Sequence, residues 1–391
     1  MQAFQGVSVV DISQGIAGPV AASILARQGA AVIKVEPPRG DWIRQIGGQV
    51  DGMTANAIAG NLGKRSLAID ATKPEGRAAV QKLARDADVL IENFRPGVMQ
   101  RLGLDYGTLA ATNPRLIYCS ITGFGASGPW AGKAGTDSIA QAFSGMVMAN
   151  SGGGAPRRIG LYVPDNITGI YAAQAISAAL YARVATGPEQ SRGRRLDISL
   201  AQSCAAFQAA PIAESQLFPD AAARQAPAVP SGEFKTRDGW IVAACLDDAM
   251  FHRFSKALGR DQWITDARYA TGDERKARAA EVAAMVIDMF STDTSSAWLA
   301  KLEAADVLCS PVNDYAALRA HPQSLHMETF SDLEQAPYGA LSLPRLPAAM
   351  DDFIAAPRLG EHSRAILAEA GYAAAEIDDL VAKGVVRAED K

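Results

Sequence analysis

Cysteine and histidine are scarce in this sequence, and their scarcity restricts the chemistry that we expect. The 391 residues include 4 Cys and 4 His. No two cysteines form a C-x-x-C pair, and no two histidines show the H-x-x-x-H spacing that places two imidazoles on one helix face. We therefore expect no metal centre. With no export signal, we expect reduced, mostly buried thiols at Cys119, Cys204, Cys245 and Cys309.

An excess of positive charge and a long apolar run are also missing. Lys and Arg number 38 against 42 Asp and Glu, so a nucleic-acid partner is not expected. The Ala-rich run 171–187 is interrupted by Gln174 and Arg183 and is too short to span a bilayer, so no membrane partner is expected. Residues 1–13 lack the basic and apolar regions of a signal peptide, and we expect a cytoplasmic protein.

Two glycine patterns fall short of nucleotide-binding motifs. G-F-G-A-S-G at 123–128 has the dinucleotide spacing, but Pro129 follows instead of the helix that would hold a pyrophosphate. Gly15 and Gly18 follow the first expected strand, and Glu36 at the end of the next could hold a ribose hydroxyl. This set is incomplete, so a tight strand-to-helix turn is favoured, and an NAD-dependent oxidoreductase is the weakest functional alternative.

Apolar strands alternate with helical patterns through the first third of the chain. Strands joined by helices of this length imply right-handed crossovers and a parallel sheet covered on both faces, hence an α/β fold. Pro19 favours the first turn of one helix, and T-K-P-E at 72–75 has capping-box spacing before another. The strands are expected at 7–11, 30–36, 66–70, 88–92 and 115–121.

Changes in composition divide the chain into domains. An Ala/Pro-rich stretch without periodicity indicates a linker, and a turn and strand at 236–246 begin a smaller α+β domain. A loose stretch over 331–360 precedes a helical pair near 361–384. We therefore expect a large domain over 1–209, a linker over 210–231, a small α+β domain over 232–325, and a return segment with C-terminal helices over 326–391 that completes the large domain.

Asp165 stands at the head of a long apolar segment, 161–187, and local chemistry gives it two compatible roles. Asp is a favoured N-cap, worth about 1 kcal/mol, and this is the more frequent role. A carboxylate beside the positive end of a helix is also expected to be ionised at neutral pH and able to attack an activated acyl group.

Cationic side chains that could hold an anionic ligand gather in the first hundred residues. Arg95 and Arg101 flank the turn 93–97 after an expected strand, at the sheet edge where ligands of open parallel sheets bind. Most such residues are solvated surface charges. The full set is Lys34, Arg39, Lys64, Arg65, Arg95 and Arg101.

Several blocks taken together resemble the class III CoA-transferases, the family of formyl-CoA transferase, carnitine CoA-transferase and the bile-acid-inducible type. The resemblance covers nearly the whole chain in order. The matching blocks are V7-S-V-V-D-I-S, A17-G-P19, G29-A-A-V-I-K-V-E-P, N61-L-G-K-R-S-L-A-I-D, A87-D-V-L-I-E-N-F-R-P-G97, S120-I-T-G-F-G, D165-N-I-T-G, R195-L-D-I-S-L200 and A356-P-R-L-G-E-H362.

This resemblance implies an interlocked homodimer, in which a Rossmann-like large domain built from both chain ends is threaded with that of its partner. It also implies that Asp165 is the nucleophile. The carboxylate would attack a donor acyl-CoA to give a mixed anhydride, and then an aspartyl-CoA thioester that passes CoA to a small carboxylic, possibly dicarboxylic, acid. Coenzyme A is then a substrate, and no permanently bound cofactor, ATP or metal is expected.

The resemblance extends to binding residues, with departures. Gln14 stands where formyl-CoA transferase has His, Ile16 where it has Gln, and Thr72 where it has Lys, which makes formate and oxalate poor substrate candidates. Weaker matches predict that Ile16, Lys133 and Gly232 line the substrate site. The expected CoA contacts are Gln14, Ala17, Arg39, Ile69, Thr72, Asn93, Phe94, Arg101 and Leu102.

Two further alternatives stay open. An α-methylacyl-CoA racemase shares the resemblance, but it needs two bases, and Thr136 holds the place of its His in G135-T136-D137. A non-catalytic acyl-CoA-binding protein would need the same binding residues without turnover. Exchange between an acyl-CoA and a free acid would exclude the second alternative.

Overall fold

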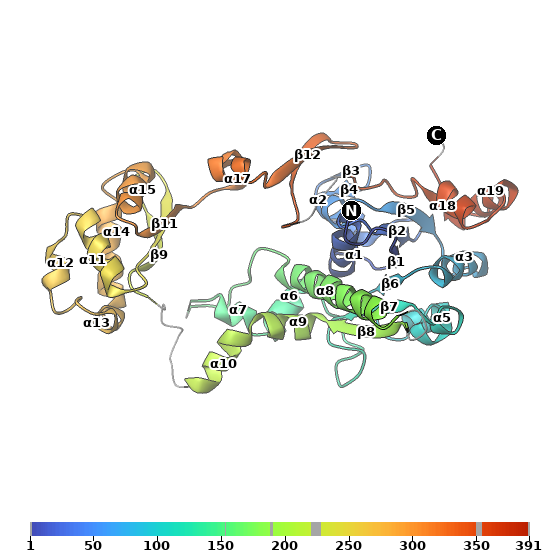
Figure 1. Ribbon diagram of the computed structural model, residues 1–391, viewed down its shortest axis with the longest axis horizontal. Coiled ribbons are helices and arrows are strands. Elements are labelled where there is room, and N and C mark those ends of the chain that lie inside the picture. The colour runs from blue at the N-terminus through green and yellow to red at the C-terminus, as the bar shows by residue number, and fades with distance from the viewer. Residues whose placement is uncertain (1, 153, 188–190, 220–227, 349–353, 390–391) are drawn as a thin grey trace. The chain divides into compact units, whose positions relative to one another are not determined.

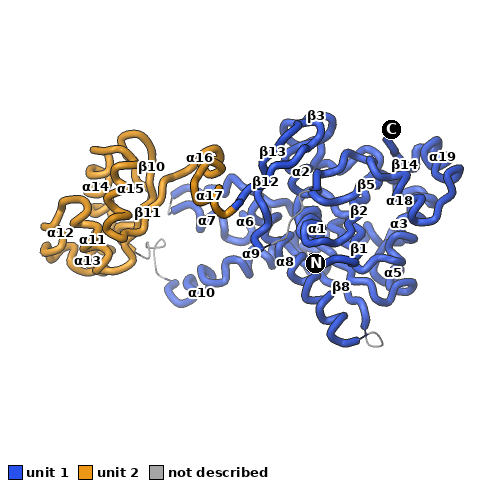
Figure 2. Tube along the Cα trace, turned by 45° about the horizontal axis from the view of Figure 1, so that its top comes forward, with its two compact units in different colours: residues 1–219, 328–391 blue, residues 220–327 orange. Residues whose placement is uncertain are grey.

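The computed structural model describes residues 2–152, 154–187, 191–219, 228–348 and 354–389. It divides into two compact units, one formed by Met1–Pro219 and Glu328–Lys391 and the other by Asp220–Met327 (Figure 2). The first unit is thus built from both ends of the chain, and the second from the middle.

A seven-stranded sheet forms the centre of the first unit (Figure 1). Its strand order is β14-β5-β2-β1-β6-β7-β8, in which β14 is antiparallel to β5 and the other pairs are parallel. The α/β fold is therefore confirmed. The order reverses between β1 and β6, and open parallel sheets bind ligands beyond the carboxyl ends of such strands. The strands are β1 (Ser8–Asp11), β2 (Ala31–Glu36), β5 (Arg65–Ile69), β6 (Val89–Glu92), β7 (Ile117–Thr122), β8 (Arg194–Ser199) and β14 (Val386–Arg387).

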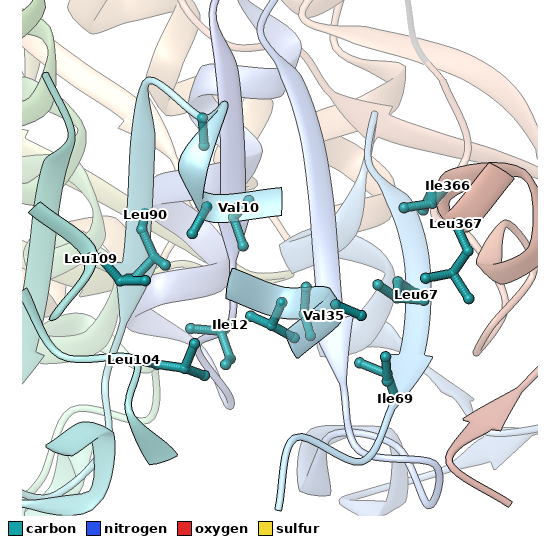
Figure 3. Close-up of a cluster of buried hydrophobic side chains, with 14 of the residues drawn as sticks. Val10, Ile12, Val35, Leu67, Ile69, Leu90, Leu104, Leu109, Ile366 and Leu367 are labelled. Atoms are coloured by element: carbon teal, nitrogen blue, oxygen red, sulfur yellow. The ribbon is translucent and has the colours of Figure 1, made fainter. Parts of the chain in front are cut away.

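Helices cover both faces of this sheet. On one face α1 (Ala17–Arg27) and α8 (Val163–Ala185) pack through buried small side chains such as Ala21 and Ala172, which let the helices approach closely. The other face forms a core of Leu, Ile and Val side chains (Figure 3), whose burial supplies the main stabilising free energy of the unit. The helices on that face are α3 (Pro74–Arg85), α5 (Tyr106–Thr112), α18 (Ser363–Glu369) and α19 (Ala374–Ala382).

Shorter elements complete the first unit, and two of them lie in stretches where the sequence showed no clear periodicity. Helix α10 (Ala209–Leu217) occupies the start of the expected linker; Pro211 lies in its first turn, where a missing N–H costs little. A hairpin occupies part of the stretch expected to be loose, 331–360. Residues 220–227 of the linker lie outside the described residues. The other elements are η1 (Trp42–Gln45), β3 (Gln49–Val50), β4 (Met53–Thr54), α2 (Ala55–Asn61), α4 (Val98–Leu102), α6 (Asp137–Phe143), α7 (Met146–Ala149), α9 (Leu200–Phe207), β12 (Phe330–Gln335) and β13 (Gly339–Pro344).

The predicted capping box at 72–75 is wrong. The N-cap of α3 is Lys73, and Pro74 is the first helical residue. Thr72 lies one residue before the N-cap, and its hydroxyl donates to Oδ1 of Asp70 at 2.6 Å. The prolyl ring fixes the start of the helix one residue later than the box requires.

The second unit has an antiparallel sheet in the order β11-β10-β9 and a core rich in aromatic side chains. Phe254 and Trp298 both pack edge-to-face against Phe290. None of the helices in the described ranges is long and apolar enough to cross a membrane. The elements are β9 (Ser231–Lys235), β10 (Trp240–Ala244), α11 (Asp248–Ala257), α12 (Gln262–Thr265), α13 (Gly272–Ala277), α14 (Ala279–Phe290), α15 (Ser295–Ala304), β11 (Leu308–Pro311), α16 (Tyr315–Ala320) and α17 (Pro322–His326).

Candidate active site

Asp165 lies in the first turn of α8 but does not cap it. The helix begins at Val163, with Tyr162 as N-cap, so Asp165 is its third residue. Pro164 favours this early start because its fixed φ suits the first helical turn and it has no N–H to satisfy. The more frequent role that local chemistry gave Asp165, that of N-cap, is therefore wrong.

A second carboxylate performs the capping. Oδ2 of Asp137 accepts the backbone N–H of Asp165 at 3.3 Å, and Oδ1 accepts Nε2 of Gln141 at 2.8 Å. Asp137 begins α6 and is 7% exposed. The side chain of Asp165 is thus not engaged in capping its own helix.

Burial and nearby groups alter the ionisation of both carboxylates. Burial, and then the negative charge of Asp137, raise the pKa of Asp165 to about 7. Burial also raises the pKa of Asp137, against the hydrogen bonds from Gln141 and the Asp165 N–H and the positive charge of Arg158. The expectation that Asp165 is simply ionised at neutral pH is therefore corrected: near pH 7 it is poised between its two forms.

A cavity of about 500 Å³ adjoins this pair. Its wall combines the two carboxylates and one arginine with neutral polar and apolar side chains. These come in part from the ends of β1, β6 and β7 and from the segment that leads into α8. Its lining residues include Gln14, Ile16, Ala17, Trp42, Asn93, Thr122, Thr136, Asp137, Gln141, Arg158, Tyr162 and Asp165.

Gln14 lies at the centre of the site. It follows β1 at the point where the strand order reverses. It lines the cavity of about 500 Å³, the candidate catalytic cavity, and two others of about 330 and 390 Å³. Asn93, which follows β6, fixes its backbone: the Gln14 N–H donates to Oδ1 at 2.8 Å and Nδ2 donates to the Gln14 carbonyl at 2.5 Å. The expected CoA contacts Gln14 and Asn93 thus meet across the two central strands.

A buried ion network supports this turn from behind. Asp41 accepts the Gly15 N–H at 2.9 and 3.0 Å and pairs with Nζ of Lys34 at 3.3 Å. Lys34 also donates to the Ser13 carbonyl, so the network fixes the backbone on both sides of Gln14. Lys64 Nζ lies 2.7 Å from Asp11.

Three residues singled out in the sequence are therefore structural. Lys34 and Lys64 are fully buried in ion pairs and cannot bind a ligand from solvent. Both oxygens of Glu36 accept from Arg44, at 2.7 and 2.8 Å, so Glu36 does not present a free carboxylate to a ribose. A fourth candidate, Arg65, is not buried and pairs at the surface with Glu369.

The expected CoA contacts gather in the second cavity, of about 330 Å³. Arg39 and Arg101 are exposed there, with no ion pair among the described residues. Lys133 lines the third cavity, with its ammonium 3.5 Å from the centre of the Trp130 ring. Gly232 lies in β9 of the second unit. The expected contacts along the second cavity are Gln14, Arg39, Ile69, Thr72, Phe94, Arg101 and Leu102, while Ala17 and Ile16 line the catalytic one.

The glycine loop after β7 shapes the catalytic cavity. Gly123 and Gly135 both line it and pack backbone to backbone; a Cβ on Gly123 would lie 2.7 Å from Cα of Gly135. Helix α6 begins only at Asp137, with Thr136 as N-cap. This agrees with a glycine loop that lines a ligand site and does not hold a pyrophosphate at a helix N-terminus. Thr136, in the place of the racemase His, supplies no base.

Three residues of the site carry no recognisable signal in the sequence. Asp137, Gln141 and Arg158 were not predicted, because no local spacing connects them to Asp165. They reach it through the packing of α6 against α8 and the loop before α8. The described residues contain no group of three or more His, Cys, Asp or Glu that could hold a metal ion.

Known proteins are similar to this chain over almost its whole length. A profile of CoA-transferase family III matches residues 4–363. Succinate–glutarate CoA-transferase of Agrobacterium fabrum (strain C58) is 35% identical, covering 93% of this chain and 94% of that protein. Succinyl-CoA:glutarate CoA-transferase of Homo sapiens is 33% identical, covering 98% and 89%. The crystal structure of a CAIB/BAIF family protein from Brucella suis has a TM-score of 0.84 and 34% identity, covering 94% and 99%. The chain is therefore an enzyme of the family III CoA-transferases.

Proposed function

We propose that this enzyme moves coenzyme A from an acyl-CoA donor to a small carboxylic acid, with Asp165 as the nucleophile. The observation that carries the proposal is a carboxylate with a pKa of about 7 on the wall of a cavity that Gln14 joins to the expected CoA contacts. The relatives named above act on succinate and glutarate, which favours a dicarboxylic acid as the acceptor.

The reaction proceeds in four substitution steps, each of which forms one bond at a carbonyl carbon and breaks another. The Asp165 carboxylate attacks the donor thioester carbonyl, forming a mixed anhydride and expelling the CoA thiolate. The thiolate attacks the Asp165 carbonyl, giving an aspartyl-CoA thioester and the donor acid. An acceptor carboxylate then attacks this thioester, and the returning thiolate takes the acceptor acyl group and frees Asp165. Splitting one difficult exchange into such steps is the advantage of covalent catalysis.

The surroundings of Asp165 suit this chemistry. A partly desolvated carboxylate beside another negative charge is a stronger base and nucleophile than one in water. Because thioester energy is conserved at each step, no cofactor beyond the CoA substrates is required. The side-chain amide of Gln14 lines the same cavity and has no hydrogen-bond partner within the described ranges, so it is available to donate to a developing oxyanion.

The second cavity suits the nucleotide end of coenzyme A. Arg39 and Arg101 offer guanidinium groups there that have no ion pair within the described ranges, and such groups bind phosphate through paired hydrogen bonds. Phe94 and Leu102 supply apolar surface in the same cavity. With the phosphates there, the pantetheine arm passes Gln14, and the thioester reaches Asp165.

We also propose that the protein is a homodimer, as the family resemblance implied. Helix α8 leaves large apolar side chains exposed: Ile170 is 55%, Tyr181 76% and Val184 78% accessible. A second copy of the chain would bury such a face. Light scattering after size-exclusion chromatography should give twice the 41.1 kDa mass of one chain. A monomer at micromolar concentration would contradict this.

Exchange of radiolabelled succinate into succinyl-CoA tests the proposed function directly. The wild-type enzyme should exchange label without ATP or added metal. Asp165→Asn keeps the shape of the side chain but removes the nucleophile, so it should lower kcat at least about 10³-fold while acyl-CoA still binds. Full activity in this variant would exclude the proposed role, and no exchange by the wild type across a panel of acids would exclude the proposed function.

A further inference from the structure

Arg158 is the one cation among the described residues that line the catalytic cavity. Its side chain is exposed and has no ion pair or hydrogen bond within the described part of the chain. Its neighbour Arg157 is also exposed, but it does not line this cavity. One of two adjacent arginines therefore reaches the reaction space.

The backbone next to Arg158 is fixed by the same side chain that fixes Asp137. Oε1 of Gln141 accepts the Ile159 N–H at 2.9 Å, and Nε2 donates to the Leu161 carbonyl at 3.2 Å as well as to Asp137. Gln141 is 1% exposed, so this connection is shielded from water. The origin of the Arg158 side chain is thus held relative to the carboxylate pair.

Charge explains what such a cation contributes. Asp137 gives the cavity negative charge, which repels an incoming carboxylate acceptor, whereas Asp165 is by then an uncharged thioester. The positive charge of Arg158 already acts on the carboxylate of Asp137: burial raises the pKa of that group, and Arg158 opposes the rise. One carboxylate of an acceptor must approach the Asp165 carbonyl, so a second carboxylate at its far end needs a cation elsewhere on the same wall.

We propose that Arg158 binds the distal carboxylate of a dicarboxylic acid acceptor while its proximal carboxylate attacks the thioester at Asp165. This inference rests on the proposed function and adds no chemical step to it. The other candidate cations that line a cavity lie elsewhere: Arg39 and Arg101 line the second cavity, and Arg95 and Lys133 line the third. Arg158 therefore determines the choice between dicarboxylic and monocarboxylic acids.

A matched pair of acceptors tests the assignment. Glutarate and valerate have the same carbon chain, but only glutarate has a distal carboxylate. In a double-displacement reaction, kcat/KM for the acceptor reports only the second half-reaction, so the donor cancels. Arg158→Met should lower kcat/KM for glutarate about 10- to 100-fold and leave that for valerate within about twofold. Arg158→Lys should restore part of the preference, and Arg157→Met, the control, should behave as the wild type.

The outcomes separate this inference from the function on which it rests. Equal losses for both acids in Arg158→Met would show that Arg158 acts on the catalytic carboxylates and would overturn the assignment. An unchanged preference for glutarate would overturn it as well, with the proposed function intact. If the wild-type enzyme exchanged CoA with neither these acids nor any other in a panel, the proposed function itself would fall.

Discussion

The backbone N–H of Asp165 donates to the side chain of Asp137 at 3.3 Å, so the start of α8 is capped by a carboxylate from 28 residues earlier in the chain. This contact keeps Asp137 close to Asp165 and leaves the Asp165 side chain free of a capping role. The same proximity raises the pKa of Asp165 beyond the effect of burial alone. Helix capping and the raised pKa of the proposed nucleophile are therefore linked in one pair of residues.

The pH dependence of the reaction should follow the ionisation of Asp165. Only the carboxylate form attacks, and its pKa is about 7, so kcat/KM for succinyl-CoA should rise with pH up to about 7 and then level off. Asp137→Asn removes the like charge and should move the midpoint to lower pH. Burial, the larger cause, remains, so the midpoint should stay above the ordinary value for Asp. Rates measured from pH 5 to 9 check this, and a profile flat down to pH 5 would contradict it.

The same pKa predicts a gain in stability when Asp165 is neutralised. The folded state holds the Asp165 proton up to about pH 7, whereas the unfolded chain releases it near pH 4. The free energy of unfolding therefore falls as pH rises through this window. Asp165→Asn should raise it by about 1–3 kcal/mol at pH 8 and by much less near pH 4.5. Urea unfolding at the two pH values measures the difference. If Asp165→Asn were less stable than the wild type at pH 8, the raised pKa of Asp165 would be contradicted.

The contact between Gly123 and Gly135 should not tolerate a side chain. Gly123→Ala places a Cβ 2.7 Å from backbone atoms that cannot rotate away, so the loop must move and the cavity must change shape. We expect a loss of about 1–3 kcal/mol in stability and a lower kcat. Gly132→Ala is the matched control, because a Cβ there meets nothing within 4 Å. Equal behaviour of the two variants in thermal unfolding and exchange would contradict the prediction.

The buried ion network should be sensitive to the loss of one partner. Burial lowers the pKa of Lys64 to about 8, against the attraction of Asp11, which it holds at 2.7 Å. Among the described residues, Lys64→Met leaves Asp11 with the more distant Lys34, at 3.8 Å, as its one cationic partner, and should cost about 3–5 kcal/mol. Arg65→Met breaks the neighbouring surface pair with Glu369 and should cost less than about 1 kcal/mol. Denaturant titration compares the two; similar losses would mean that the network is not strongly coupled.

Much of the fold could be predicted because its strands are short, apolar and separated by helical patterns. The expected strand at 88–92 corresponds to Val89–Glu92, and that at 30–36 to Ala31–Glu36. The strand β14 and the hairpin β12–β13 were missed. β14 has only two residues, and its pairing with β5 joins positions more than 300 residues apart, which no local pattern records. The homodimer, the cytoplasmic location and the domain boundaries of the sequence analysis stay predictions.

Some residues of the candidate site could likewise be predicted from the sequence, and others could not. Residues in recognisable blocks, such as Asp165, Asn93 and Phe94, could be singled out from the sequence and line adjoining cavities. Lys34 and Glu36 could not be separated from ligand-binding residues, because sequence does not show that a charge is buried beside its partner. Asp137 and Arg158 could not be predicted for another reason. They come close to Asp165 only when α6 and the loop before α8 pack together.

Trapping of the activated Asp165 carboxyl group tests most directly the claim that Asp165 forms the covalent intermediate. The tryptic peptide over 159–183 contains Asp165 as its only carboxylate side chain. The enzyme is incubated with succinyl-CoA without an acceptor, treated with hydroxylamine, digested and analysed by mass spectrometry. We predict a hydroxamate on this peptide in the wild type and in Arg157→Met, and none in Asp165→Asn. Turnover by the wild type with this peptide unmodified, or a hydroxamate on a different peptide, would contradict the account.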